Sequence, residues 1–258
     1  MKMRLLKSRL STVQKICLSG LIMALVVILQ KVVAINYLAF APFVRISLGG
    51  PALIMCASVL LGPAYGLIIG IGSDLLGYLV FDPRIMPPFL QITAIYALLG
   101  FVAYFVFSAV FSIKNRKAIA ITEIAVLAVI WAIIVVFTLT RNELTYFGST
   151  YKLNVLSKSL ICSISFAIFL AIVLLGIFVE PKDDNVLTSP LHICFASFIC
   201  DFFVLVLFGS VMKGWAFGWS TFLTILICQS LVMFFNVLID TFFISTFQRF
   251  TKNYYVEA

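Results

Sequence analysis

Basic side chains flank the longest apolar stretch of the sequence, and their chemistry suits the binding of an acidic solute. Arg45 stands at the start of this stretch, Arg84 near its end, and Lys31 lies near the end of the preceding apolar run. A guanidinium group binds a carboxylate through two parallel hydrogen bonds, and aromatic faces stack on flat rings. The aromatic and amide side chains that complete this candidate site are Tyr37, Tyr78, Phe89 and Gln91. The set predicts an organic anion with a ring system as ligand. The alternative is that the arginines anchor helix ends and that Lys31 extends to the membrane surface.

Catalytic, redox and ATP-dependent chemistry find little support in the sequence. The acids inside apolar segments, Asp74, Asp201 and Asp240, belong to no paired-acid motif and have no nucleophile–base pair beside them. The six cysteines are scattered through apolar segments, where cysteine behaves as a small hydrophobic residue. His192 is the only histidine, and no G-x-x-x-x-G-K-S/T motif occurs. We therefore expect no catalytic residue, no metal site, no cofactor and no ATP binding by this chain.

Composition sets the fold class. The chain is 63% hydrophobic and 11% charged, and it contains 26 phenylalanines. This composition predicts an all-α polytopic membrane protein with a single membrane domain over 1–258. Residues 1–15 form a basic N-terminal segment. Apolar runs then predict eight spans: 16–35, 48–61, 64–81, 92–113, 118–140, 156–179, 190–212 and 219–247.

The second and third predicted spans belong to one apolar stretch that runs from Pro42 to Pro88. This stretch is too long for one crossing of a bilayer whose core is about 30 Å thick. Gly62-Pro63 interrupts it, and glycine followed by proline marks a turn. We therefore expect two short helices, 48–61 and 64–81, that fold back and return Arg45 and Arg84 to the same membrane face.

The distribution of positive charge predicts the orientation in the membrane. The net charge is +8, and clusters of lysine and arginine precede the first span, follow the fourth and follow the last. Such clusters mark cytoplasmic loops, so both termini are expected in the cytoplasm of a bacterial cell membrane. Nucleic acid is not expected as a partner, because the basic residues form no patch interleaved with exposed aromatic residues.

Small residues form stripes on two of the predicted helices. Gly66 and Gly70 share a face of the third helix with Ser73, Asp74 and Gly77, and Gly20 and Ala24 share a face of the first. Small residues let another helix backbone approach closely within a membrane. The stripes therefore predict contact with a second membrane subunit, and the alternative is helix packing inside this protein. The polar residues Ser197, Asp201, Gln229, Asn236 and Asp240 also align on the last two spans, either for function or for hydrogen bonds between helices.

Several of these residues belong to a recognisable succession of motifs. R-I-S-x-G from Arg45 to Gly49 is followed by L-x-G-P-x-x-G from Leu60 to Gly66 and by G-x-x-x-D-L-x-G from Gly70 to Gly77. A proline-rich segment comes next. This order resembles the substrate-binding S component of energy-coupling factor (ECF) transporters, over about residues 10–113 and again over 187–247. The R-I-S element is most similar to the folate-specific members.

The resemblance implies a protein that captures a vitamin and performs no chemistry itself. It implies three protein partners, a transmembrane coupling protein and two ECF ATPases, besides the vitamin and membrane lipid. Arg45 and Ser47 would line the vitamin pocket, while Gly20 and Ala24 would face the coupling protein. S components commonly have six spans. Spans one to four over 16–113 and the last two over 190–247 would supply them, with 118–179 as an additional transmembrane hairpin.

Other functions remain open at this level. Pro88-Phe89-Leu90-Gln91 stands where folate-type members usually have a P-G-F-T-like element, so pantothenate and riboflavin are alternative vitamins. A stand-alone secondary carrier that uses the acids as proton relays is a further alternative, but the inverted repeats typical of such carriers were not found. The two remaining alternative functions are an intramembrane enzyme and a structural scaffold.

Overall fold

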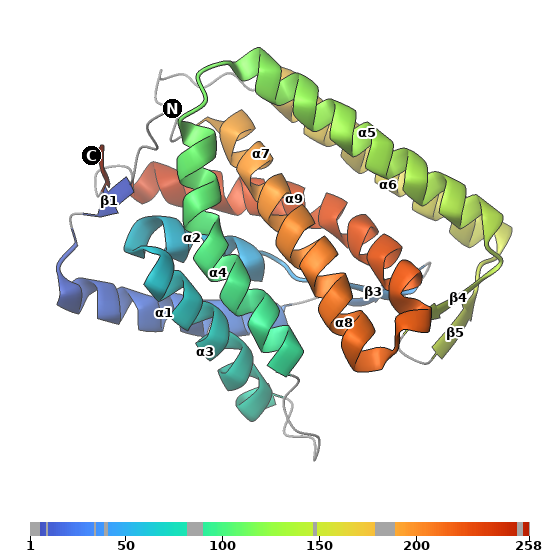
Figure 1. Cartoon of the computed structure of the whole chain (residues 1–258), viewed down its shortest axis with the longest axis horizontal. Coiled ribbons are helices and arrows are strands. Elements are labelled where there is room, and N and C mark those ends of the chain that lie inside the picture. The colour runs from blue at the N-terminus through green and yellow to red at the C-terminus, as the bar shows by residue number, and fades with distance from the viewer. Residues whose placement is uncertain are drawn as a thin grey trace.

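Helices make up most of the fold. The computed structural model describes residues 6–8, 10–33, 35–38, 41–81, 90–146, 149–178, 189–251 and 255–257. The helices in these ranges are α1 Thr12–Lys31, α2 Gly50–Leu61, α3 Pro63–Phe81, α4 Leu90–Phe111, α5 Arg116–Thr140, α6 Val155–Phe178, α7 Pro190–Cys200, α8 Gly209–Phe217 and α9 Phe222–Thr251 (Figure 1). A π-helix, Asp201–Phe208, joins α7 to α8 without a break, and a 3-10 turn, Trp219–Thr221, precedes α9.

The predicted fold-back between the second and third spans is confirmed. Helix α2 ends at Gly62, whose φ of 107° lies in a region that side chains with a Cβ rarely adopt. Pro63 then begins α3, because a proline at the first helical position loses no hydrogen bond. The two helices pack against each other after this turn. With 12 residues, α2 is only about 18 Å long and does not cross a bilayer by itself.

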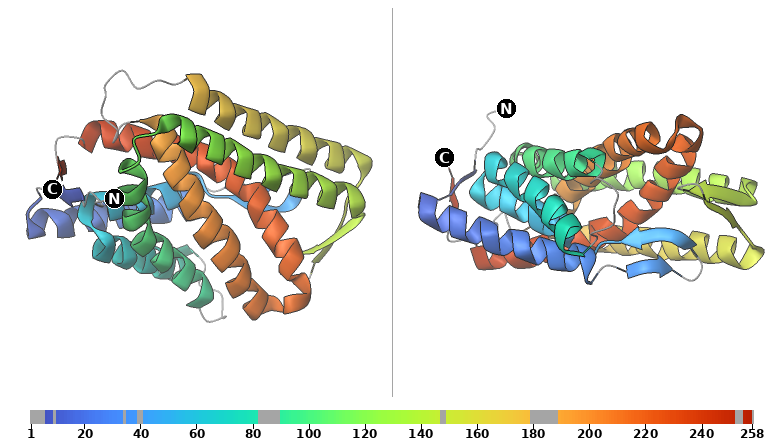
Figure 2. Two further views of the ribbon diagram at one scale, coloured as in Figure 1. Left: turned by 45° about the horizontal axis from the view of Figure 1, so that its top comes forward. Right: turned by 90° about the horizontal axis from the view of Figure 1, so that it is seen from below.

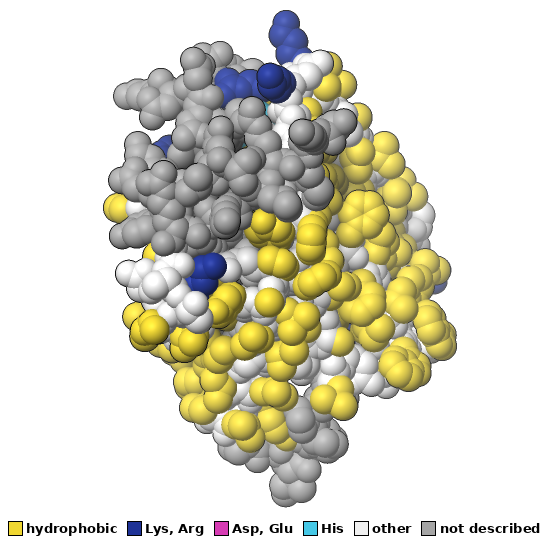
Figure 3. Space-filling view, turned by 60° about the vertical axis from the view of Figure 1, so that its left-hand side comes forward, with side chains coloured by type: hydrophobic (Ala, Val, Ile, Leu, Met, Phe, Trp, Pro, Cys, Tyr) yellow, Lys and Arg dark blue, Asp and Glu magenta, His cyan; other side chains and the backbone are white. Residues whose placement is uncertain are grey.

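Membrane crossing is supported by length and composition for the other spans. Within the described residues, 7 helical segments are long and apolar enough to span a bilayer, with α7 to α8 counted as one segment. Large hydrophobic side chains cover much of the surface on the face shown in Figure 3. The chain is therefore an all-α polytopic membrane protein, as the composition predicts.

Two groups of helices form two hydrophobic cores. The first core joins α1, α2, α3 and α4 to α7 and α9, and its fully buried side chains include Ile54, Leu99 and Ile193. The second core joins α5 and α6 to the opposite side of α7 and α9, through residues such as Leu127 and Phe234. The α5–α6 pair accordingly lies along one edge of the molecule in Figures 1 and 2.

Polar contacts fix the two ends of the α5–α6 pair. The ring nitrogens of His192, at the start of α7, lie 3.0 Å from Ser189 Oγ and 3.0 Å from the Ile113 carbonyl oxygen, which precedes α5. At the other end, Lys158 Nζ donates to the Leu139 carbonyl at 3.1 Å and to Asn142 Oδ1 at 2.9 Å. The only histidine of the chain therefore has a packing role here.

Short antiparallel strand pairs occur between the helices, which the sequence did not predict. The pairs are β2 Ile35–Leu38 with β3 Ala41–Ile46, β4 Glu143–Tyr146 with β5 Ser149–Lys152, and β1 Leu6–Ser8 with β6 Tyr255–Glu257. The β1–β6 pair places both ends of the chain on the same side of the molecule (Figure 1). In place of the eight predicted spans, the described residues therefore contain 7 segments long enough to cross a bilayer and the shorter α2, which returns the chain between α1 and α3.

Candidate functional site

The β2–β3 hairpin carries two of the predicted ligand-binding residues. Arg45 lies in β3 and pairs with Asn36 in β2, while Tyr37 lies at the irregularity in the ladder between Asn36 and Leu38. The hairpin packs against α9 through β3 (Figure 2, right). It therefore connects the end of α1 to the start of α2 along the last helix.

Ser47 lies where this hairpin enters α2. Gly49 has a φ of 85°, and a Cβ there would lie 2.9 Å from the Phe243 ring of α9. A Cβ on Gly50 would meet the side chain of Gln30 from α1 and Ser47 Oγ at 2.9 Å. The Ser47 hydroxyl is buried and has no hydrogen-bond partner among the described residues. Because an unsatisfied buried hydroxyl is costly, this oxygen is a candidate for binding a ligand.

Lys31 takes a position that the sequence did not suggest. Its aliphatic stem crosses Gly77 of α3, where a Cβ would lie 2.8 Å from Lys31 Cε. From there the ammonium attracts the Asp74 carboxylate electrostatically. Asp74 also accepts a hydrogen bond of 2.6 Å from Thr93 Oγ1 of α4. Lys31, Asp74 and Thr93 thus link α1, α3 and α4, and this network gives Lys31 a structural partner.

We expect the Thr93–Asp74 hydrogen bond to contribute measurably to stability. A bond to a charged group is worth about 1.5–3 kcal/mol, so Thr93→Val should lower the free energy of unfolding by about that amount. Thermal unfolding of the purified protein in detergent would measure the loss. Thr140→Val is the matched control, because that exposed hydroxyl bonds only to carbonyls of its own helix. Equal destabilisation by both variants would contradict this role of Thr93.

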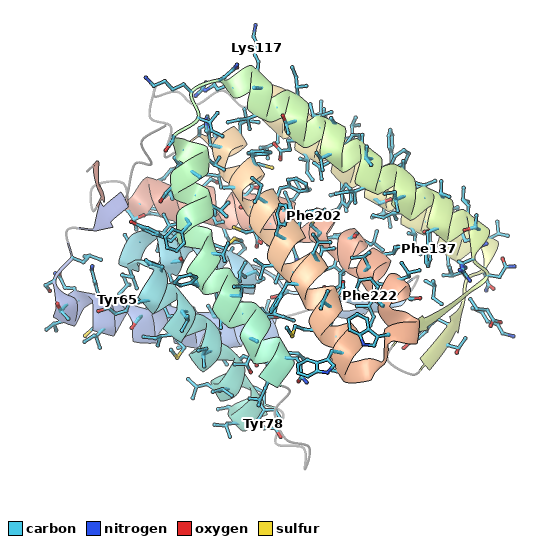
Figure 4. All side chains as sticks on the ribbon, in the orientation of Figure 1. Tyr65, Tyr78, Lys117, Phe137, Phe202 and Phe222 are labelled. Atoms are coloured by element: carbon cyan, nitrogen blue, oxygen red, sulfur yellow. The ribbon has the colours of Figure 1, made fainter. Side chains whose placement is uncertain are left out.

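Two further predicted ligand residues, Tyr78 and Gln91, lie near the junction of α3 and α4. Gln91 lies half-buried in the first turn of α4, and Tyr78 lies near the end of α3 (Figure 4). Arg84 and Phe89 lie outside the described residues. Because α3 and α4 pack side by side in opposite directions, their joined ends lie together at the end of the molecule opposite Lys117 (Figure 4).

The two small-residue stripes have different surroundings. A Cβ on Gly66 would meet the backbone oxygen of Gly100 in α4, and one on Gly70 would meet the backbone oxygen of Tyr96. Both glycines are buried. The prediction that Gly66 and Gly70 contact a second subunit is therefore wrong, because α4 of the same chain already covers them. Gly20 and Ala24 of α1 are exposed, and nothing lies within 4 Å of a Cβ on Gly20.

Buried polar residues of the last helices were noticed in the sequence but were not assigned to the site. The structure places Asp201, the first residue of the π-helix, beside Asp240 of α9. Asp74 belongs to the separate network with Thr93. Sequence spacing shows which of these residues share a helix face, but only the packing of α7 on α9 brings the two carboxyl groups together. Among the described residues, no group of three or more His, Cys, Asp or Glu side chains is arranged to hold a metal ion.

Comparison with known proteins identifies one family. The family model described as "ECF-type riboflavin transporter, S component" matches residues 10–180, which include α1 to α6. No curated protein and no solved structure matches the chain. The match supports the resemblance to ECF S components but not to their folate-specific members.

Proposed function

Because the chain belongs to the family of ECF-type riboflavin transporter S components, we propose that it captures riboflavin outside the cell for import. The family match over 10–180 is the observation that carries this proposal. It also supports a non-enzymatic role, since the family is one of transport components. The R-I-S element resembles folate-specific members, but the family match over most of the chain favours riboflavin.

The unpartnered polar groups of the candidate site also suit riboflavin. Riboflavin brings neutral ring N–H and hydroxyl groups, which carboxylates and unpaired hydroxyls such as Ser47 can accept or share.

We place the vitamin where the β2–β3 hairpin meets α9 and the start of α2. Ser47, with its unpartnered hydroxyl, supports this location. Arg45 and Tyr37 would contribute from the hairpin, and Gln91, Arg84 and Phe89 from the α3–α4 junction. Lys31 is a weaker candidate for binding the vitamin, because Asp74 already attracts its ammonium group.

A binding measurement tests the vitamin assignment. The purified chain in detergent should quench the fluorescence of riboflavin on titration, and excess unlabelled folate should not restore it. Binding of folate with no response to riboflavin would contradict the proposal. Absence of any bound vitamin, with the protein folded by thermal unfolding, would favour a scaffold or a carrier of another solute.

Arg45→Ala is expected to weaken riboflavin binding. A hydrogen bond from a charged donor is worth about 1.5–3 kcal/mol, which corresponds to roughly a 10- to 150-fold loss of affinity. Fluorescence titration of the variant would measure it. Arg141→Ala is a suitable control, because Arg141 is exposed at the end of α5, where it lies 5.8 Å from the Phe137 ring. Unchanged affinity in Arg45→Ala would return Arg45 to the role of a membrane anchor.

The proposed partners are the transmembrane coupling protein and two ATPases of an ECF transporter, which must supply the energy for import. The exposed face of α1 at Gly20 and Ala24 would contact the coupling protein.

We place the chain in the bacterial cell membrane with both termini in the cytoplasm, because of the distribution of its lysines and arginines. We further propose that α1–α4 with α7–α9 form the S-component bundle of six helical segments, in which the short α2 takes the place of one full span, and that α5–α6 add a hairpin to it. The first hydrophobic core supports this division, because it contains no residue of α5 or α6.

A further inference from the structure

Two carboxyl groups meet inside the protein, close to the middle of the membrane. Asp201 is 0% exposed and Asp240 is 1% exposed. Their carboxyl groups lie within hydrogen-bonding reach of each other. Asp201 is eleven residues beyond the start of α7, or about 16 Å along a helix, which is roughly half the thickness of the hydrocarbon core. Two ionised carboxylates in contact at this depth would be strongly unfavourable.

No cation offsets these charges in the described part of the chain. None of the four carboxylate oxygens has a hydrogen-bond partner there. The ionisable groups that interact with the pair from the surrounding helices are Cys56 of α2, Cys194 and Cys200 of α7, and, through Cys194, Glu123 of α5. All of these groups are neutral or negative, so they cannot stabilise a second negative charge.

The two carboxyl groups differ in one respect. Helix α2 begins beside Asp240, and the backbone N–H of Ala52 in its first turn approaches the Asp240 carboxylate. The first N–H groups of a helix have no partner within the helix, and they carry a partial positive charge. Gly49, at the cap position, has no side chain to satisfy them. Asp240 therefore has a favourable partner for a negative charge, whereas Asp201 has none.

We propose that Asp201 and Asp240 form a proton-binding site, in which Asp201 holds a single proton and donates it in a hydrogen bond to ionised Asp240. Asp240 then accepts a hydrogen bond from the Asp201 O–H, and the Ala52 N–H lies close to the same carboxylate. The pair joins the π-helix, α9 and the start of α2. Since α2 follows directly from Ser47 and the β2–β3 hairpin, both aspartates act as positioning residues for the inner end of that hairpin.

A bound sodium ion is the competing occupant. Ser197 Oγ and Asn236 Oδ1 are buried and unpartnered, and each lies one helical turn before one of the aspartates. These oxygens would suit a hard cation. The proton is favoured because it satisfies the contact between the two carboxyl groups directly. The Ala52 N–H also lies close to the Asp240 carboxylate, and its partial positive charge would disfavour a cation there.

Infrared difference spectroscopy of the purified full-length chain tests the proposal. The spectrum should contain the C=O stretch of a protonated, buried carboxyl group that shifts on transfer to D₂O. Asp201→Asn should remove this band, and Asp240→Asn should retain it, because Asp201 then donates to the new amide oxygen. Asp74 is a buried aspartate that belongs to the separate network with Thr93. Asp74→Asn is therefore the control, and it should leave the Asp201 band unchanged. Identical bands in Asp201→Asn and the unmodified chain would overturn the proposal.

Two further results would separate a proton from sodium and from a purely structural role. Replacing Na⁺ by choline should leave the band and the melting temperature unchanged, and a change in either would assign the site to sodium. Asp201→Asn should melt close to the unmodified chain because its amide still donates to Asp240. Asp201→Ala should melt at a clearly lower temperature, and equal melting of both would overturn the hydrogen-bonded link. These measurements need no vitamin, so their outcome is independent of whether the chain binds riboflavin.

Discussion

Gly66→Leu is expected to prevent the chain from folding normally. A Cβ on Gly66 would meet the Gly100 backbone oxygen, and a Cβ on Gly100 would meet the Gly66 backbone oxygen, so α3 and α4 touch through their backbones here. Neither backbone can rotate away as a flexible side chain would. Overpacking typically costs 1–3 kcal/mol, and a whole leucine between two backbones should cost about 3 kcal/mol or more. That loss is a large fraction of the stability of a typical protein.

The yield of folded protein in detergent and its melting temperature would measure this effect. Gly100→Leu should behave in the same way, because the contact is reciprocal. Gly20→Leu is the matched control: the substitution is the same, it is also in a helix, and nothing lies within 4 Å of a Cβ at that position. Normal folding and riboflavin binding by Gly66→Leu would show that α3 and α4 do not pack as described.

Gly20→Leu combined with Ala24→Leu should abolish uptake while leaving riboflavin binding intact. Both residues are exposed on α1 and one helical turn apart, so two leucines would prevent another helix from approaching closely. The ligand residues lie elsewhere, on the hairpin and near the junction of α3 and α4. Riboflavin uptake into proteoliposomes that contain the coupling protein and the ATPases would measure the loss, and fluorescence titration would measure binding.

Ala132→Leu provides the control for added bulk on a lipid-facing helix. Ala132 is exposed on α5, which belongs to the proposed additional hairpin, and its replacement should change neither uptake nor binding. Full uptake by the Gly20→Leu/Ala24→Leu variant would mean that the coupling protein contacts another face of the molecule. Loss of both uptake and binding would instead indicate a damaged fold.

These two predictions use stripes that look alike in the sequence. Gly66-xxx-Gly70 and Gly20-xxx-Ala24 both place small residues one turn apart, and both were interpreted as surfaces for a partner. The structure separates them, since α4 covers the first and leaves the second exposed. A small residue permits close approach, but its spacing does not identify the helix that approaches.

The sequence by itself determined the properties that depend on local chemistry. Hydropathy located the membrane helices within a few residues, as for α4 and α5. Gly62-Pro63 located the fold-back, because only glycine readily adopts the backbone conformation found there. The succession of motifs after Arg45 identified the S-component family, although it did not identify the vitamin.

Only the tertiary structure decided which side chains meet. Lys31 crosses Gly77 toward Asp74, Thr93 bonds to Asp74, and Asp201 faces Asp240 although the two are separated by most of two helices. In each case the partner comes from another helix, and its choice depends on how whole helices rotate and cross. A helix has the same hydropathy whichever way it is turned among neighbours of similar polarity, so packing alone fixes these contacts.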